Sequence, residues 1–245
     1  MLSEWGSFAL GVLAVATLTL AVLKLAGAGL GALPLVAVLR AAVQLTLVAL
    51  ILQGALAMHW VLVLFVLLML STASWTAGHR VRGLPGGMQG AALGVVSGSM
   101  IALGTVALLR LVSTEPQQLI AIAGITIGTS MSVATLSLRR YRSLVKDRAG
   151  EVEAWLSLGA TPVQATREVR REAVGEAMIP NLDQTKSTGL VTLPGAFVGA
   201  LFAGLDPLEA AQFQLVVLVS LGFSASVTAV IGTRWAARSV HLPLA

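Results

Sequence analysis

The chain has 245 residues, of which 56% are hydrophobic and only 11% charged, and its mean hydropathy is +0.88. A soluble domain is about 25% charged, so this composition excludes a water-soluble globular domain and a disordered chain. The absence of cysteine excludes disulfides, thiolate metal ligands and cysteine nucleophiles. We therefore expect an all-α integral membrane protein with a single transmembrane domain over residues 1–245.

Seven stretches are long enough to cross a bilayer, which takes about 20 apolar residues in a helix. They are based on six long runs free of Asp, Glu, Lys and Arg, of which the run 41–78 is long enough for two helices with a tight turn near Met58. We expect the first to be retained as a membrane helix, because no basic residue precedes it as in a signal peptide. In chain order the expected spans are 5–23, 36–57, 61–78, 88–109, 118–138, 181–203 and 209–232.

The basic residues predict the orientation of these spans, because Lys and Arg concentrate in cytoplasmic loops. With the N-terminus outside and the C-terminus cytoplasmic, only Arg110 among the 16 basic residues falls clearly outside, and Lys186 lies in the sixth span. The net charge of +5 therefore indicates topology rather than nucleic-acid binding. The basic residues expected in the cytoplasm are Lys24, Arg40, Arg80, Arg82, Arg139, Arg140, Arg142, Lys146, Arg148, Arg167, Arg170, Arg171, Arg234 and Arg238.

One large polar segment, about 139–178, lies between the fifth and sixth spans and carries more than half of the formal charges. Apolar residues recur there at three- and four-residue spacing, which predicts an amphipathic helix over 139–158. Gly159 suits the position that follows a helix. Thr161, Pro162 and Gln164 form a capping-box pattern that would begin a second helix, reaching about Met178. We therefore expect a cytoplasmic helix-turn-helix, either a solvated connector whose Arg residues meet anionic lipid headgroups or a rigid element that passes motion to the membrane helices.

The turn of this segment resembles the EAA signature of ATP-binding-cassette (ABC) transporter permeases, since Glu153-Ala154 is followed by Gly159 six residues after the glutamate. The match is partial, because Val169-Arg170-Arg171 stands where importers have an apolar residue and Leu-Pro. In such permeases this segment forms the coupling helix, which sits in a groove of the ATPase subunit. The resemblance implies an ATPase-coupling surface made of Glu151, Glu153, Ala154, Leu158, Gly159, Ala160, Thr161 and Pro162.

A longer ordered string resembles the FetB-type permease family, the bacterial iron-export permeases that are related to plant aluminium-tolerance permeases. The resemblance covers nearly the whole chain, with Arg40, Gln44 and residues 122–124 (IAG) in its first part. The rest of the string is 156–162 (LSLGATP), 179–180 (IP), Asp183, Lys186, 188–191 (TGLV), 193–195 (LPG), Gly199 and 202–207 (FAGLDP).

This resemblance implies the transmembrane permease subunit of an ABC transporter in the cell inner (cytoplasmic) membrane, exporting iron or another metal. It implies a separate FetA-like ATPase that binds ATP and Mg²⁺, with no cofactor in this chain. The sequence agrees, because none of Lys24, Lys146 and Lys186 follows a glycine as a P-loop requires, so we expect no enzyme activity. Seven spans are few for one pathway, so we expect a homodimer of the permease.

Polar residues within spans are costly, at about 2.5–3.5 kcal/mol for a charged one, and are candidates for a transport pathway or gate. Asp183 and Lys186 can pair at the expected cytoplasmic start of the sixth span, either to fix the helix or to gate a path. Pro194-Gly195 is expected to kink that span at its middle. Arg40 either snorkels to lipid phosphates or joins Gln44, one turn away, in the path.

Three rows of small residues at four-residue spacing favour close helix packing, either within the chain or between two copies of it. They are Gly90, Gly94 and Gly98; Gly124, Gly128 and Ser132; and Gly195, Gly199 and Ala203.

The sequence leaves the metal ligands and the substrate open, since no His pair or carboxylate cluster has ligand spacing. Hydroxyl residues of the fifth span, among them Ser130, bond to their own helix or line a hydrated path. Two other function classes compete with the ABC permease. One is an ATP-independent secondary transporter or channel, and the other is a membrane hydrolase that uses Ser97 or Ser99 with His79 but lacks a nucleophile motif.

Overall fold

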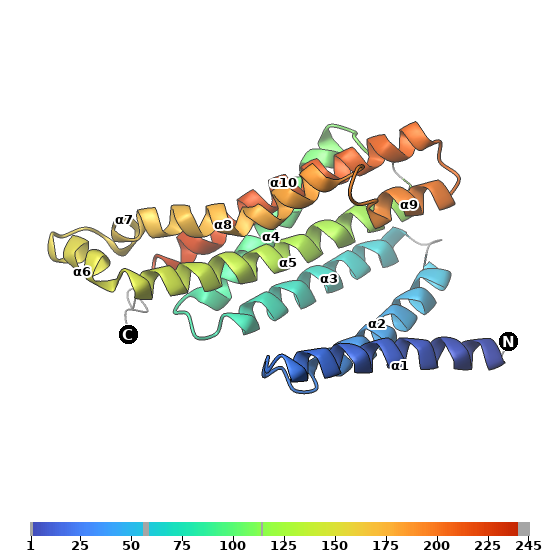
Figure 1. Cartoon of the computed structure of the whole chain (residues 1–245). Coiled ribbons are helices and arrows are strands. Elements are labelled where there is room, and N and C mark those ends of the chain that lie inside the picture. The colour runs from blue at the N-terminus through green and yellow to red at the C-terminus, as the bar shows by residue number, and fades with distance from the viewer. Residues whose placement is uncertain (1, 56–58, 114, 240–245) are drawn as a thin grey trace. The chain divides into compact units, whose positions relative to one another are not determined.

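The computed structural model describes residues 2–55, 59–113 and 115–239, and within them it is almost entirely helical (Figure 1). The chain divides into two compact units, residues 1–58 and 59–245. Six of the described helices are long and apolar enough to cross a membrane. The prediction of an all-α membrane protein is confirmed, whereas the turn expected near Met58 lies outside the described residues. That all 245 residues act as one transport domain stays a prediction.

The first unit is a pair of helices, α1 (Leu2–Leu25) and α2 (Leu33–Ala55). Gly27, Gly29 and Gly31 all have positive φ in the connection between them, so this turn uses conformations that other residues adopt only at a cost. Among the described side chains of this unit only Ala16 is buried. Such apolar, outward-facing helices are what lipid contact requires, and the two expected spans are confirmed as helices.

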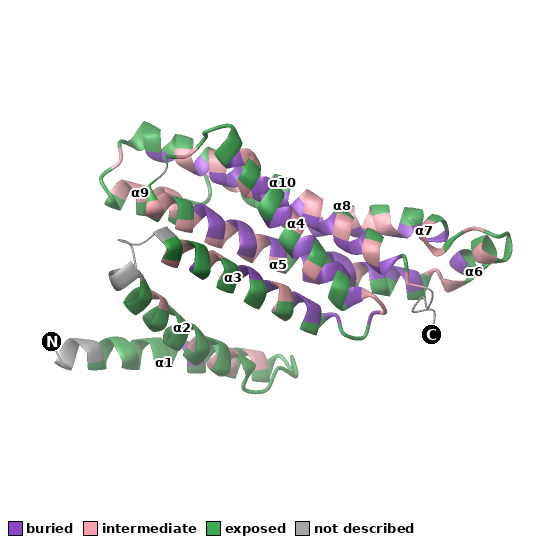
Figure 2. Cartoon of the chain, turned by 180° about the vertical axis from the view of Figure 1, so that it is seen from behind, coloured by how far each residue is buried: buried purple, intermediate pink, exposed green. Residues whose placement is uncertain are grey.

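The second unit is an elongated helical bundle built on α3 (His59–Arg80), α4 (Gly87–Leu108), α5 (Pro116–Asp147) and α10 (Pro207–Ala236). These helices pack on one another, and the buried residues follow their shared faces (Figure 2). They match the third, fourth, fifth and seventh expected spans. We call the end of the bundle that carries residues 148–166 the elbow end, and the end that carries residues 109–113, 115–116 and 203–207 the opposite end (Figure 1).

The expected sixth span, a continuous helix over 181–203, is wrong. Helix α8 (Arg167–Ser187) stops, residues 188–194 are non-helical, and α9 (Gly195–Phe202) follows. Gly189 has a φ of +94°, outside the helical region. Pro194 is the N-cap of α9 and does not kink a continuous helix; Pro disfavours helical geometry in the residue before it. Together α8 and α9 run beside α10 as a discontinuous helix (Figure 1).

The polar segment differs from the predicted helix-turn-helix in its bounds. Its first part is no separate helix, because α5 continues without a break from Pro116 to Asp147. Two short helices follow, α6 (Ala149–Ser157) and α7 (Pro162–Ala165). The second predicted helix ends at Ser187 instead of Met178, since α8 is one helix of 21 residues.

The row Gly90, Gly94 and Gly98 packs within the chain, against α10. A Cβ atom added at Gly90 would lie 2.6 Å from the carbonyl oxygen of Gly232, and one added at Gly94 would lie 2.8 Å from that of Thr228. The Thr228 hydroxyl donates a hydrogen bond of 3.0 Å to the Gly94 carbonyl oxygen. Glycine is therefore required for this close backbone approach, as in other membrane helix pairs.

A buried cluster of three serine hydroxyls joins α4, α5 and α10. Ser99 Oγ donates to Ser130 Oγ at 3.0 Å, and Ser130 Oγ lies 2.5 Å from Ser224 Oγ. All three side chains are fully buried. Ser130 therefore bonds to neighbouring helices inside the bundle and lies away from any surface path.

Candidate functional site

The elbow, residues 148–166, is held in shape by local hydrogen bonds. At the end of α6 the Gly159 N–H donates to the Leu156 carbonyl at 2.9 Å and the Ala160 N–H donates to the Trp155 carbonyl at 3.1 Å, the bonding pattern of a Schellman motif. Gly159 has the φ of +84° that this motif needs. The turn at Gly159 that the sequence predicts is confirmed.

The start of α7 is fixed by the predicted capping box. The Thr161 N–H donates to Gln164 Oε1 at 2.9 Å, and the Gln164 N–H donates to Thr161 Oγ1 at 3.4 Å. Pro162 occupies the first turn, where its missing N–H costs nothing. Two defined helix ends therefore flank the turn 158–161, and its shape is set by the local sequence.

The tip of the elbow presents apolar side chains to its surroundings. Leu158 is 80% exposed, and Trp155 on the last turn of α6 is also exposed. The side chains of Glu151, Glu153 and Ala154 are exposed around them. The tip therefore combines two exposed large apolar groups with two exposed carboxylates.

The base of the elbow is buried and continuous with the membrane bundle. Val152 is 0% exposed, and Ala165 and Val169 are also buried. They belong to one apolar cluster that also contains Tyr141 on α5 and reaches Leu70 on α3. Close-packed interiors transmit displacement, so a force applied at the tip would reach α3 and α5 through direct contacts.

Charged groups also clamp α5 to α8 near the elbow. Arg140 Nη2 donates to Glu176 Oε1 at 2.8 Å, and Arg148 Nη2 donates to Glu172 Oε2 at 2.5 Å. Arg170 donates to the Val163 carbonyl at 2.9 Å, and burial lowers the pKa of its guanidinium below the usual value. The two ion pairs are half-exposed, so each contributes at most about 1 kcal/mol.

Asp183 and Lys186 form the expected pair, with 4.0 Å between Lys186 Nζ and Asp183 Oδ1. Because α8 packs antiparallel to α5 and Glu176 pairs with Arg140, Asp183 lies about 10 Å and Lys186 about 15 Å further along α8, beside the apolar part of α5. Both are exposed, so the charged pair lies on the surface of the second unit.

The other predicted pathway residues lie on separate elements. Arg40 and Gln44 are one turn apart on α2, both exposed, in the first unit. Pro194 and Gly195 lie at the start of α9 in the second unit. Their role in a path stays a prediction.

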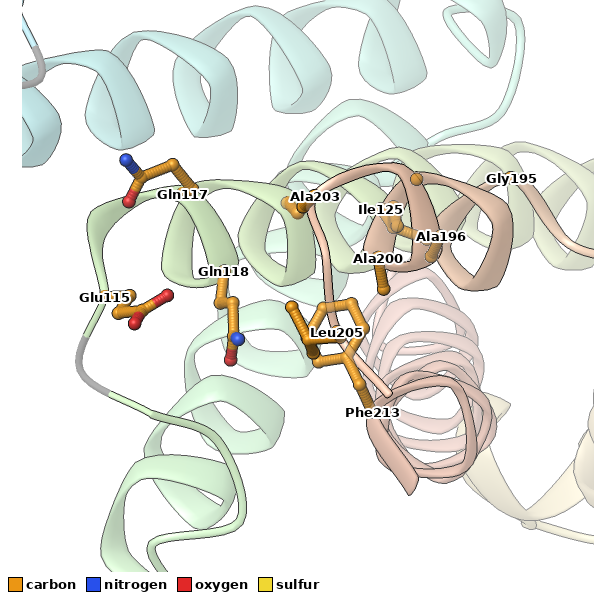
Figure 3. A pocket seen from close by; sticks show the side chains of 12 residues that line it. Glu115, Gln117, Gln118, Ile125, Gly195, Ala196, Ala200, Ala203, Leu205 and Phe213 are labelled. Carbon is orange, nitrogen blue, oxygen red and sulfur yellow. The ribbon is translucent and has the colours of Figure 1, made fainter. Parts of the chain in front are cut away.

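A cavity of about 810 Å³ lies between the start of α5 and helix α9 (Figure 3). Gly195, Gly199 and Ala203, the third small-residue row, line it on the α9 side. Glu115 and Gln118 line it at the start of α5, where the Ser113 hydroxyl donates to Gln118 Oε1 at 2.9 Å. This small-residue row therefore borders an open space instead of packing against a helix.

Gln214 on α10 is a candidate that was not predicted from the sequence. Its side chain is 5% exposed, its Oε1 has no hydrogen-bond partner, and it lines a cavity of about 400 Å³ together with Thr185 and Thr188 of the broken segment. In the sequence this residue is an amide within an apolar span, and it is overlooked when only charged residues are considered.

Comparison with known proteins identifies the family. A model of the uncharacterised protein family UPF0014 matches residues 5–241. The chain belongs to this family. No solved structure was found that matches it significantly.

Curated relatives support the assignment to UPF0014. The UPF0014 membrane protein STAR2 of Oryza sativa subsp. japonica is 35% identical over 239 residues, covering 94% of this chain and 83% of the relative. Protein ALUMINUM SENSITIVE 3 of Arabidopsis thaliana is 36% identical over 174 residues, 71% of this chain and 63% of the relative. The probable iron export permease protein FetB of Escherichia coli (strain K12) is 33% identical over 168 residues, 69% of this chain and 65% of the relative. The predicted resemblance to FetB-type permeases is thereby confirmed, and the chain is a multi-pass membrane protein of the UPF0014 family.

Proposed function

We propose that this chain is the transmembrane permease subunit of an ABC transporter that exports iron or another metal. A separate FetA-like ATPase binds ATP and Mg²⁺ and drives transport, and the chain itself has no enzyme activity. The observation that carries the proposal is the elbow, with its exposed apolar tip and its buried base. The elbow lies on the cytoplasmic side, with the N-terminus outside, as the basic residues indicate.

The elbow has the properties that coupling to a motor requires. A docking surface must be accessible, and Trp155 and Leu158 are. It must also be rigidly joined to the membrane helices, and the cluster that contains Val152 and Leu70 supplies that connection. Rigid-body motion of the ATPase would then tilt α5 and α8 together.

The broken segment supports a homodimer. Leu190 is 97% exposed at the middle of residues 188–194, where the backbone is not helical. Non-helical backbone at membrane depth is tolerated only where protein or a water-filled cavity covers it. A second copy of the chain would cover this loop and the nearby Asp183–Lys186 pair.

The cargo assignment rests on the name of FetB and on the cavity that Glu115 lines. Among the described residues no group of three or more His, Asp or Glu side chains could hold a metal ion. A transporter must release its cargo, so one carboxylate with amide neighbours suits a site of low affinity for a cation.

The test is ATP hydrolysis by the complex of this chain with a FetA-like ATPase, reconstituted in liposomes and measured against iron, manganese, zinc and aluminium. We expect one or more of these metals to stimulate hydrolysis several-fold over the metal-free rate. If none of the four metals changes the rate of ATP hydrolysis, the metal assignment is wrong. If the chain forms no complex with the ATPase, the ABC assignment is wrong. The chain without the ATPase is the control and should hydrolyse no ATP.

Replacing Glu115 with glutamine tests the cavity. Loss of its charge should raise the metal concentration that gives half-maximal stimulation about tenfold, because one carboxylate contact to a cation is removed. The basal ATPase rate should stay the same. Glu168→Gln, which neutralises an exposed glutamate at the elbow end, is the matched control and should leave the metal dependence unchanged. An equal response of the two variants would exclude Glu115 from the path.

The competing function is an ATP-independent secondary transporter or channel. The Asp183–Lys186 pair favours it, because ionisable groups at membrane depth often carry coupling ions. The two functions are separated by transport with the purified chain alone in liposomes under an imposed ion gradient. Cargo uptake without ATPase or ATP would favour the secondary transporter.

A further inference from the structure

A cavity at the elbow end of the bundle collects four cationic side chains. Its volume is about 440 Å³, and it lies at the end of α3, next to the point where the apolar part of α5 ends. The cationic lining comes from Arg80 on α3 and from three residues of α5, and the remaining polar residue is Ser143. The three α5 cations are Arg139, Arg142 and Lys146.

None of the four cations is neutralised by a neighbouring acid in the described part of the chain. The ion pairs found there join Arg140 to Glu176, Arg148 to Glu172 and Lys186 to Asp183. The acid next to the cavity along α5 is Asp147, which accepts a hydrogen bond from Ser143 at 3.3 Å and is not part of the lining. Four like charges around one space repel one another, so an anion in the cavity would be stabilised by all of them.

The lining has a second, apolar part. Val81, Leu84 and Leu138 lie in the same cavity, and all three are buried residues of the main core cluster. A site for a free inorganic anion needs no apolar surface, whereas a lipid headgroup is joined to glycerol and acyl chains. The cavity therefore has cationic walls over a buried apolar floor, and its place at the end of two membrane-spanning helices decides between these two kinds of anion.

The position of the cavity along the bundle agrees with this chemistry. Arg80 is the last residue of a membrane-spanning helix, and Arg139 directly follows the apolar part of α5. Both lie where apolar sequence gives way to polar sequence, which is the depth of lipid phosphates in a bilayer.

We propose that this cavity binds the phosphate of an anionic phospholipid, with the guanidinium groups of Arg139 and Arg142 as its main donors. Arginine presents paired N–H groups that match two phosphate oxygens. The aliphatic stems of the arginines would pack against the glycerol, since the side chains of Val81, Leu84 and Leu138 are almost fully buried. Binding joins α3 to α5 below the elbow, so it would stabilise the base from which the elbow projects.

The guanidinium of Arg142 packs on the backbone of the 81–86 connection. A Cβ atom added at Gly83 would lie 2.6 Å from Arg142 Nη1, so the guanidinium packs directly on this glycine. A larger side chain at Gly83 would displace the guanidinium without changing the charge. Gly83→Leu therefore tests position separately from charge.

The experiment is native mass spectrometry of the full chain in detergent, titrated with phosphatidylglycerol, phosphatidylcholine or inorganic phosphate. The wild type should bind phosphatidylglycerol in preference to phosphatidylcholine. Arg139→Gln with Arg142→Gln should weaken phosphatidylglycerol binding about 30-fold, since each basic residue contributes about 1 kcal/mol. Gly83→Leu should weaken it less. Arg167→Gln with Arg171→Gln removes the same charge from an exposed part of α8 and should have little effect.

Three outcomes would overturn the proposal. One is an equal loss of lipid binding in the two double variants, which would indicate a general charge effect. Another is displacement of the lipid by inorganic phosphate at similar concentration, which would indicate a site for a free anion. The last is unchanged lipid binding together with lost ATPase association, which would make this cavity part of a protein-docking surface. Thermal unfolding of each variant must match the wild type, so that lost binding is not lost folding.

Discussion

Replacing Gly94 with valine is expected to lower the free energy of unfolding by about 3 kcal/mol, the largest effect of any single change considered. The added Cβ would lie 2.8 Å from the Thr228 carbonyl oxygen, which belongs to the backbone of α10 and cannot rotate away. The two helices would have to separate, and the hydrogen bond from Thr228 to the Gly94 carbonyl would be lost. Thermal unfolding of the detergent-purified protein measures the loss.

The matched control is Gly104→Val on the same helix. A Cβ at Gly104 meets nothing within 4 Å, so the substitution has the same effect on helix propensity without a clash. Its unfolding temperature should lie close to that of the wild type. Similar stability of the two variants would show that α4 and α10 do not approach as closely as the structure has them.

Replacing Leu158 with aspartate is expected to weaken association with the proposed FetA-like ATPase by about 30-fold while the chain itself folds normally. Leu158 is 80% exposed at the tip of the elbow, so its own fold buries little of it. In a complex it would be an apolar anchor, and loss of such an anchor costs about 2 kcal/mol or more. Co-purification with the ATPase and metal-stimulated ATP hydrolysis measure the loss.

Two further variants sharpen this test. Gly175→Asp places the same charge on α8, at a glycine with nothing within 4 Å, and should leave ATPase association intact. Gly159→Arg forces a side chain into a φ of +84° and puts a large cation beside the tip, so it should abolish association. Normal assembly and transport in Leu158→Asp and Gly159→Arg would refute docking at the elbow.

Locally determined features followed directly from the sequence. Six of the seven expected spans are long apolar helices, because hydropathy depends on the residues of each segment alone. The Schellman motif at Gly159 and the capping box from Thr161 to Gln164 were predictable for the same reason, since their hydrogen bonds join residues three or five apart.

Features that depend on neighbouring helices were predicted less well. The apolar run 187–205 contains enough hydropathy for a helix, yet Gly189 and Pro194 break it, and residues 188–194 form a non-helical loop with Leu190 exposed. The position of Asp183 beside the apolar part of α5 follows only from the ion pair between Glu176 and Arg140, because this pair shows how α8 lies along α5. Gln214 gained importance only because it is buried without a partner for its Oε1.

The sequence by itself determined that this is a membrane protein, where most spans lie and how the elbow turns, because hydropathy and helix capping act over a few residues. The tertiary structure decided which of the three small-residue rows packs against another helix. The sequence could not, because all three rows have the same four-residue spacing. The Gly90 row meets α10, Gly128 meets nothing within 4 Å, and the Gly195 row borders a cavity. Close packing needs a second surface at the right distance, and that surface belongs to residues far away in the chain.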